Sequence, residues 1–188
     1  MSFDTTYNNL MRAILTEDVE EKRVALLPGG FKPPHKGHFE ALKHIIDAHE
    51  CTEAYVFIGN KDRDGITSAQ SEMIWNIYGD NIDNVDVHAE ISDVTPVKSV
   101  YEYADEHRDS RLFIGAGEED MKRYAWFEKH ADEYPNVELV PIPPKFGRIS
   151  GTETRQKIHD KAEDAMDFIP RLKHWSDTDR VARIVGLR

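Results

Sequence analysis

Cysteine is almost absent from this sequence, with Cys51 the only one among 188 residues. A single cysteine allows no internal disulfide and excludes a cysteine-rich zinc site. The chain also has no apolar run approaching the roughly 20 residues needed to span a bilayer. Residues 1–9 are polar and have neither the basic start nor the apolar run of a signal peptide. We therefore expect a soluble, cytoplasmic protein without a membrane partner.

An excess of positive charge is lacking as well. The sequence has 24 basic and 35 acidic residues, which gives a formal net charge of −11. A general nucleic-acid binder needs a positive surface that displaces phosphate counterions, so this function class is excluded. A local basic pocket for a small polyanion stays compatible with the charge. Because 39% of the residues are apolar, the chain can bury one sizeable core, and we expect a single domain over residues 1–188.

Short apolar runs alternate along the chain with longer amphipathic runs. The expected strands are residues 23–27, 54–58, 85–88, 111–114 and 137–142. The expected helices between them are residues 38–50, 67–78, 97–107 and 119–134. This alternation predicts an α/β fold with a parallel sheet that is covered on both faces. In such sheets ligands bind beyond the carboxyl ends of the strands, where the strand order reverses.

Helices are also expected at both ends of the chain. An N-terminal extension, residues 1–20, contains a predicted short helix at residues 4–15. Residues 151–188 turn helical again, with predicted helices at 152–167 and 177–184. No internal repeat, linker or low-complexity segment divides the sequence, which agrees with one domain.

The first expected strand leads directly into a distinctive turn. Residues 29–38 read G-G-F-K-P-P-H-K-G-H and are followed by an amphipathic run. Glycine lets the backbone approach a ligand closely and permits a positive φ in a sharp turn. His35 and His38 are then placed at a helix N-terminus, where free N–H groups and the helix dipole attract phosphate. Two imidazoles in that position can donate hydrogen bonds to phosphate oxygens as charge develops in a transition state.

Two other interpretations of this histidine pair compete with a phosphate site. Histidines at i and i+3 can bind a metal, but no third ligand stands out nearby. They can also be incidental polar residues of a loop. A Gly-Gly turn alone is weak evidence, and the prediction of a phosphate site depends on the whole string.

The string resembles the G-x-F-x-P-x-H-x-G-H signature of the nucleotidylyltransferase superfamily, which shares its H-x-G-H motif with class I aminoacyl-tRNA synthetases. The resemblance implies a Rossmann-like sheet of order 3-2-1-4-5. It also implies that His35 and His38 contact the triphosphate and stabilise the pentacoordinate phosphorus. Lys32 departs from the usual Asp or Gln, and a cation there either adds a phosphate contact or faces solvent. The nucleotide-binding residues expected from this segment are Gly29, Gly30, Phe31, Lys32 and Gly37.

A second motif follows the last expected strand, where residues 147–155 read G-R-I-S-G-T-E-T-R. Ser150 and Glu153 have the spacing of a capping box, which predicts a helix start there. The string also resembles the superfamily's second signature, I-S-x-T-x-x-R. This resemblance implies that Arg155 is catalytic and that the segment binds the leaving pyrophosphate. The nucleotide-binding residues expected here are Arg148, Ile149, Ser150 and Thr152.

A glycine-rich turn follows the fourth expected strand, at residues 115–120. It is not the fingerprint of a nicotinamide dehydrogenase, because Asp120 replaces the third glycine and the turn follows the wrong strand. In the family that this chain resembles, the corresponding turn lines the base and ribose pocket. Gly115, Gly117, Glu119 and Asp120 are expected to bind nucleotide on that basis.

The loop after the second expected strand carries candidate acceptor contacts. Lys61 and Arg63 can reach the phosphate of an acceptor, and the alternative is that they are solvated loop charges. Relatives often have Arg in the following helix, where this chain has Gln70, Ser71 and Glu72, so the usual acceptor contact stays open. Trp75 is expected mainly in the core, with a stacking contact to the acceptor as the alternative.

Together the motifs predict an enzyme that transfers a nucleoside monophosphate from a nucleoside triphosphate to a small phosphorylated acceptor and releases pyrophosphate. Mg²⁺ is the expected cofactor and is held through substrate phosphates, without a metal site built from side chains. The string S-G-T-E-T-R is close to S-G-T-E-I-R in nicotinamide-mononucleotide adenylyltransferases, which favours ATP and that class of acceptor.

Several alternatives stay open. The G-G-F-K-P-P-H opening also occurs in cytidylyltransferase-like proteins, so CTP with a phosphorylated alcohol or sugar is the second hypothesis. A non-catalytic nucleotide-binding regulator is the third. A fragment of a class I aminoacyl-tRNA synthetase is excluded by the short length, the acidity and the lack of a K-M-S-K-S-like loop. A homo-oligomer is compatible with the sequence.

Overall fold

A computed structural model describes residues 21–146 and 149–188. The expected helix at residues 4–15 and Arg148 lie outside the described residues. The structure contains a five-stranded parallel sheet of order β3-β2-β1-β4-β5, so the predicted fold and strand order are confirmed. The strands are β1 (Arg23–Gly29), β2 (Glu53–Ile58), β3 (Asp86–Ile91), β4 (Arg111–Ala116) and β5 (Val137–Pro141).

Alternating side chains of β1 separate two cores, one on each face of the sheet. Ala25 and Leu27 belong to one buried cluster, whereas Val24 and Leu26 belong to the other. These four side chains are at most 5% exposed. Central strands of parallel sheets are buried on both faces and therefore read as continuous apolar runs. That is why β1 was recognisable from its sequence.

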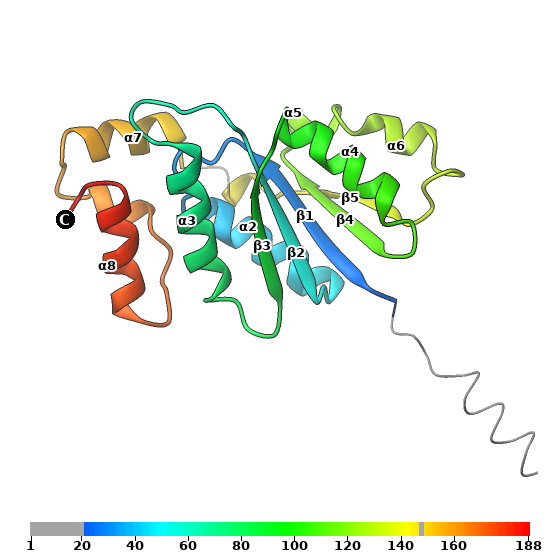
Figure 1. Ribbon diagram of the computed structural model, residues 1–188, viewed down its shortest axis with the longest axis horizontal. Coiled ribbons are helices and arrows are strands. Elements are labelled where there is room, and N and C mark those ends of the chain that lie inside the picture. Colours follow the sequence, from blue (N-terminus) through cyan, green and yellow to red (C-terminus); the bar gives the residue numbers. More distant parts are fainter. Residues whose placement is uncertain (1–20, 147–148) are drawn as a thin grey trace, which may run out of the picture.

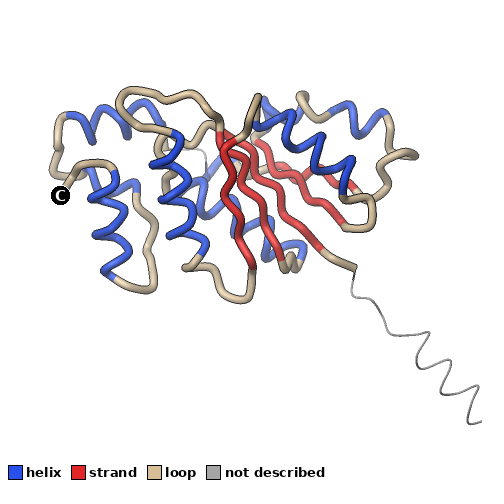
Figure 2. Tube along the Cα trace, in the orientation of Figure 1, coloured by secondary structure: helices blue, strands red, loops and turns tan. Residues whose placement is uncertain are grey.

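Helices cover both faces of the sheet, as Figure 2 shows in blue against the red strands. The longer helices are α2 (Lys36–His49), α3 (Ser68–Gly79), α4 (Pro96–Glu106), α7 (Gly151–His159) and α8 (Trp175–Ile184). The shorter ones are α5 (Glu118–Met121), α6 (Ala125–Lys129) and the 3-10 turns η1 (Pro144–Phe146) and η2 (Ala165–Phe168). Apolar residues of α2 and α3 pack in the first core, and those of α4 pack in the second. Helix α8 lies beside α3 at the left of Figure 1.

The expected helix at residues 119–134 is wrong, because the structure forms α5 and α6 with a break between them. Tyr124 lies in the break and is 2% exposed, within the second core. The hydroxyl of Tyr101 donates to the carbonyl of Arg123, with 2.7 Å between the oxygens. Packing of a large aromatic side chain and this bond from another helix replace the continuous helical ladder.

The expected helix at residues 152–167 is also too long. Helix α7 ends at His159, and Lys161 follows with a left-handed φ of 50°. The amide of Ala162 donates to the carbonyl of Lys157 at 3.0 Å, and the amide of Lys161 donates to that of Ile158 at 3.2 Å. This pair of bonds is a Schellman motif, which satisfies the last carbonyls of a helix and terminates it. A left-handed lysine gives no terminator signal in the sequence.

The strand order reverses beside β1, which pairs with β2 on one edge and with β4 on the other. Ligand sites of open α/β sheets lie beyond the carboxyl ends of strands at such a switch point. Within residues 21–146 and 149–188, no helix has the length and apolar character needed to cross a membrane.

Candidate functional site

A cleft of about 760 Å³ lies at the carboxyl ends of β1, β2 and β4. It brings together segments that are far apart in the sequence, from the β1–α2 turn to α7. The predicted site residues that line it are Gly29, Gly30, Phe31, Lys32, His35, Gly37, His38, Lys61, Arg63, Gly115, Gly117, Asp120, Ile149 and Arg155. Those that do not line it are Trp75, Glu119, Ser150 and Thr152. The two motifs recognised in the sequence therefore meet in one place.

The sharp turn after β1 is made by a residue other than the expected glycines. Phe31 has a left-handed φ of 48°, whereas neither Gly29 nor Gly30 has a positive φ. A non-glycine residue in this region is strained by contacts of its Cβ. Burial holds it there, because the Phe31 ring is 5% exposed and packs edge-on against Trp75, with ring centroids 5.3 Å apart. The hydroxyl of Ser71 also donates to the Phe31 carbonyl.

Lys32 does not face solvent, so that one of its two expected placements is wrong. Its Nζ donates to the carbonyls of Gly30 and Gly59 at 2.8 Å each, and the residue is 4% exposed. Burial lowers the pKa of the ammonium from 10.5 to about 8, although Asp62 nearby acts in the opposite direction. The ammonium thus ties the turn after β1 to the turn after β2. The Lys32 ammonium has three N–H donors, and the two carbonyls use two of them. Because Lys32 lines the cleft, the third donor is available to a ligand there.

His35 and His38 stack on each other at the start of α2. Their ring centroids are 3.5 Å apart and their planes differ by 18°. The backbone N–H of His35 donates to Nδ1 of His38 at 3.2 Å. An imidazole nitrogen that accepts a hydrogen bond carries no proton, so in the neutral ring of His38 the proton is on Nε2. His38 is thereby arranged as a donor through Nε2.

Both imidazoles are held in the neutral form. Burial lowers the pKa of His35 from 6.5 to about 4. Burial, and in addition the neighbouring His35, lowers the pKa of His38 well below its usual value. His35 is 3% exposed, and its Nδ1 is buried without a hydrogen-bond partner among the described atoms. A desolvated pair of this kind favours hydrogen bonding by neutral rings over a permanent double positive charge.

Gly37 lies between the histidines because no side chain fits there. A Cβ at this position would lie 2.0 Å from the carbonyl oxygen of Phe146 in η1. The backbone leading to the second motif therefore rests directly against the first turn of α2. Close backbone approach, not a positive φ, is the reason for this glycine.

Arg155 reaches from α7 back to the turn after β1. Its Nη1 donates to the Lys32 carbonyl at 2.9 Å, and its Nη2 donates to Oγ1 of Thr152 at 3.1 Å. Its Nε donates to Oδ2 of Asp64 at 2.7 Å. The side chain is 11% exposed. Thr152 therefore orients the guanidinium without lining the cleft itself.

Ser150 acts as the cap of α7, as the capping spacing predicted. Its Oγ accepts from the amide of Glu153 at 3.3 Å. The reciprocal contact is not made, because the Glu153 carboxylate pairs with Lys157 at 3.2 Å. Ser150 lines a smaller hollow of about 230 Å³ beside α7.

The loop after β2 forms a small hairpin whose Lys61 and Arg63 both line the cleft. Arg63 and Ile66 exchange two backbone hydrogen bonds, of 3.0 and 2.9 Å. Asp64 and Gly65 occupy the two turn positions, with φ values of 47° and 79°. An Asp-Gly pair with positive φ at both positions is the preferred turn of a two-residue hairpin. The pair Asp64-Gly65 is the signal in the sequence for this hairpin, which was not among the expected elements.

The turn after β4 forms the opposite wall. Gly115 has no room for a side chain, since a Cβ would lie 2.2 Å from Cδ1 of Ile45. Asp120 lines the cleft but is paired with Arg123 at 3.1 Å, whereas Glu119 is exposed outside it. A further wall was not foreseen, because it contains no charged motif. It consists of Asn60, Val94, Thr95, Pro96 and Val97.

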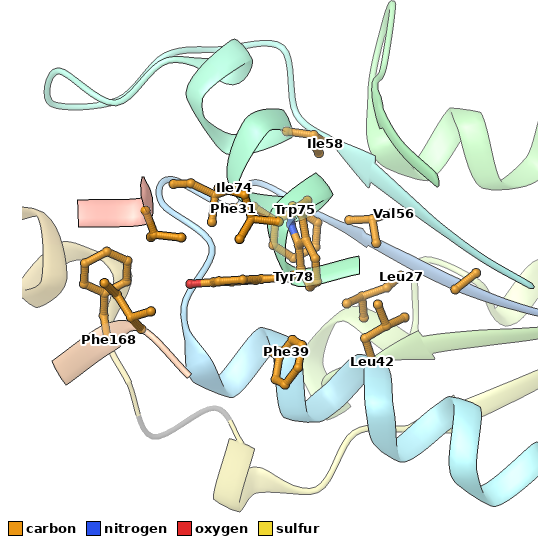
Figure 3. Close-up of a cluster of buried hydrophobic side chains, with 14 of the residues drawn as sticks. Leu27, Phe31, Phe39, Leu42, Val56, Ile58, Ile74, Trp75, Tyr78 and Phe168 are labelled. Carbon is orange, nitrogen blue, oxygen red and sulfur yellow. The ribbon is translucent and has the colours of Figure 1, made fainter. Parts of the chain in front are cut away.

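Trp75 is a core residue, and the alternative of a stacking contact with an acceptor is wrong in this structure. The side chain is 0% exposed and lies among Phe31, Ile74 and Tyr78, as Figure 3 shows. Its ring packs edge-on against Tyr78, with centroids 5.7 Å apart. The side chain lies on the buried face of α3. An amphipathic sequence pattern indicates that face, but it does not tell whether a residue on it packs in the core or lines the cleft.

The cleft concentrates positive charge in an acidic protein. Its described lining includes one carboxylate, Asp120, and five cationic side chains. These are Lys32, Lys61, Arg63, Arg123 and Arg155. The first turns of α2 and α7 also border the cleft, and the amide groups at helix N-termini favour anions. The arrangement is suited to a polyanion such as a triphosphate.

No protein-family model matches the sequence, and no curated protein matches it either. Among solved structures, the chain is similar to a nicotinic acid mononucleotide adenylyltransferase of Plasmodium falciparum complexed with NaAD. The TM-score is 0.59 at 15% identity, covering 89% of this chain and 98% of that one. It is also similar to a putative nicotinate-nucleotide adenylyltransferase of Vibrio parahaemolyticus, with a TM-score of 0.60 at 13% identity, covering 85% and 98%.

A third similar structure is a bifunctional NMN adenylyltransferase/ADP ribose pyrophosphatase of Francisella tularensis, complexed with AMP and a manganese ion. The TM-score is 0.53 at 15% identity, covering 87% of this chain and 51% of that one. This chain therefore corresponds to about half of the bifunctional protein. At these identities the likeness concerns the fold, and the chain has the fold of these adenylyltransferases.

Proposed function

We propose that this protein is a nucleotidylyltransferase that transfers a nucleoside monophosphate from a triphosphate, ATP in the first place, to a small phosphorylated acceptor. The observation that carries the proposal is the meeting of the stacked, neutral His35 and His38 with Arg155 in one cationic cleft. The fold shared with adenylyltransferases supports the same reaction class. Two of the similar adenylyltransferases are complexed with NaAD and with AMP, which favours an adenine nucleotide here.

The reaction joins an acceptor phosphate oxygen to the α-phosphorus and breaks the bond between that phosphorus and the bridging oxygen to the β-phosphate. Pyrophosphate leaves with the electron pair of the broken bond. The chain contributes position and charge stabilisation, as in phosphoryl transfer generally. Nε2–H of His38 donates to the α-phosphate oxygens as their charge rises, with His35 beside it. Arg155 binds the β- and γ-phosphates with the guanidinium donors that its protein contacts leave free.

Mg²⁺ fits this site only as a partner of the substrate phosphates. Among the described residues no group of three or more His, Cys, Asp or Glu side chains is arranged to hold a metal ion. Asp120, the described carboxylate that lines the cleft, is already paired with Arg123. Magnesium commonly binds through phosphates and water with few protein ligands. The ion would neutralise phosphate charge, and no residue role above depends on it.

The two halves of the cleft are assigned to the two substrates. The Gly115–Asp120 turn is assigned to the base and ribose, in line with the family resemblance. Lys61 and Arg63 on the β2 side are assigned to the acceptor phosphate, because both cations line the cleft and Arg63 is not ion-paired among the described residues. Lys32 is assigned the role of holding the turns after β1 and β2 together, and its remaining donor is available to a phosphate.

Pyrophosphate release tests the proposed function. The full-length protein is incubated with Mg²⁺ and each of ATP, CTP, GTP and UTP, against a panel of acceptors that includes nicotinate and nicotinamide mononucleotides and phosphorylated sugars and alcohols. Release with ATP and a phosphomonoester is the expected result. Release with CTP alone establishes the cytidylyltransferase alternative. Binding of a nucleotide with no release under any pairing favours a nucleotide-binding regulator and contradicts the proposal.

His38→Ala removes the donor aimed at the α-phosphate. We expect kcat to fall by about 100- to 1,000-fold, because the contact strengthens in the transition state, with a much smaller change in nucleotide affinity. Steady-state kinetics and titration with a non-hydrolysable analogue measure the two quantities. His159→Ala is the matched control, since His159 is exposed near the end of α7 and does not line the cleft. Unchanged turnover in His38→Ala would exclude the assigned role.

Arg155→Ala removes the guanidinium assigned to the β- and γ-phosphates. We expect the affinity for ATP to fall by about tenfold or more, and the affinity for AMP to change far less, because AMP lacks those phosphates. Calorimetric titration with the two nucleotides measures the difference. Arg180→Ala serves as control, since its exposed side chain pairs with Asp177 on α8. An equal loss for ATP and AMP contradicts the role.

The buried neutral histidines predict a loss of stability in acid. The folded pKa of His35 is about 4, whereas the unfolded value is 6.5. Between these pH values the unfolded chain binds more protons, so the free energy of unfolding falls as the pH falls. His35→Asn keeps a residue that caps helices well and removes this proton uptake. Between pH 7 and pH 5 the variant should lose about 1–2 kcal/mol less stability than the unchanged protein.

Urea denaturation at pH 7, 6 and 5 measures this difference. The histidines that do not contact His35 cancel in the comparison, so the difference reports on His35 and on His38, which stacks on it. Parallel loss of stability in the two proteins would show that His35 takes up its proton equally in the folded and unfolded states.

A further inference from the structure

The contact between Asp64 and Arg155 has no role in the reaction described so far. Asp64 lies at the tip of the loop of residues 61–66, in which Arg63 and Ile66 pair as a small hairpin, and Arg155 lies on α7. Their Oδ2 and Nε atoms are 2.7 Å apart. The pair joins the acceptor side of the cleft to the triphosphate side, across 91 positions of sequence.

The two partners differ in how firmly they are held. The Arg155 side chain is 11% exposed and is fixed by Thr152 and the Lys32 carbonyl, whereas the Asp64 side chain is 70% exposed. Residues 61–65 are all exposed, and Ile66, at 4% exposure, anchors the base of the hairpin in the core. Oδ1 of Asp62 accepts from the amide of Ser68 at 2.9 Å, which holds the start of the loop. The tip beyond it, Asp64 and Gly65, is docked on the better-buried Arg155. Arg155 is therefore the more firmly held partner, and Asp64 connects the loop to it through the ion pair.

The ion pair is compatible with phosphate binding. A guanidinium has five N–H donors in a plane. Asp64, Lys32 and Thr152 use three of them, so two stay available to a triphosphate. A bound triphosphate therefore does not need to displace Asp64. It further immobilises the group that Asp64 holds.

We propose that Asp64 is a positioning residue that docks the acceptor hairpin on Arg155, so that ordering of Arg155 by the triphosphate also orders Lys61 and Arg63. The inference rests on the proposed function for the identity of the two ligands. Asp64 itself contacts neither substrate. Its effect is a coupling between the two halves of the site, and such a coupling is reciprocal: each substrate raises the affinity for the other.

Asp64→Asn is the discriminating variant. Asn tolerates a left-handed backbone at least as well as Asp, so the turn at φ 47° is kept while the ion pair is lost. Asp83→Asn is the matched control. Asp83 is 78% exposed and pairs with Lys173 at 2.6 Å, so it loses a similar ion pair away from the cleft.

Hydrogen exchange of the hairpin amides tests the docking without knowledge of the acceptor. The amides of Arg63 and Ile66 bond across the hairpin, so their exchange reports its opening. In the nucleotide-free full-length protein we expect exchange to be about fivefold faster in Asp64→Asn, in the range of a partly exposed ion pair, and unchanged in Asp83→Asn. Equal exchange in Asp64→Asn and the unchanged protein overturns the proposal.

A second arm adds a non-hydrolysable ATP analogue and tests the coupling. We expect the analogue to slow hairpin exchange in the unchanged protein and in Asp83→Asn, but not in Asp64→Asn, which still binds the analogue at least as tightly because one negative charge is gone. A merely structural role would weaken analogue binding as well. Slowing that persists in Asp64→Asn overturns the coupling. If no variant binds the analogue, the proposed function fails, while the nucleotide-free arm still decides the docking.

Discussion

The ammonium of Lys32 holds two strand ends together, and the arrangement of the cleft depends on that contact. It is shared between the carbonyls of Gly30 and Gly59, at the ends of β1 and β2. Hydrogen bonds from a charged donor contribute about 1.5–3 kcal/mol each, which offsets part of the cost of burying the charge. Burial lowers the pKa of Lys32 more than the nearby Asp62 raises it. The carbonyl of the same residue receives Arg155, so a single residue links β1, β2 and α7.

Hydroxyl groups of α3 reinforce this junction. Ser71 donates to the carbonyl of Phe31, and Ser68 donates to that of Gly59 at 3.0 Å. Turns at the ends of parallel strands have carbonyls that no ladder satisfies, and buried carbonyls need partners. Side chains from the neighbouring helix fill that need and fix the shape of the turn. The strained φ of Phe31 is maintained by the same contacts.

The electrostatics of the cleft differ from those of the molecule as a whole. The chain carries a formal net charge of −11, yet its cleft is lined mainly by cations and by helix N-termini. The histidines at its centre are kept neutral by burial, so they add donors without adding fixed charge. Positive charge is supplied by Arg155 and by the hairpin cations, which lie where a polyanion can be bound from two sides. An ion pair between Asp64 and Arg155 connects these two sides.

The sequence by itself determined the order of strands and helices, the β1–α2 turn and the start of α7. These features are local: an apolar run, a helix with one apolar face, and capping residues at fixed spacings. Together with the motif resemblance they predicted the strand order and brought His35, His38 and Arg155 to one site. They did not foresee why position 37 is a glycine, which is the close approach of the Phe146 backbone.

Only the tertiary structure decided which side chains reach the cleft and what each one contacts. The burial of Lys32 and Trp75, the positive φ of Phe31 and the pairing of Arg155 with Asp64 all depend on partners that are distant in the sequence. The break between α5 and α6 depends on the core that receives Tyr124. No local pattern encodes such partners, because the free energy that selects them comes from packing and desolvation in the assembled fold.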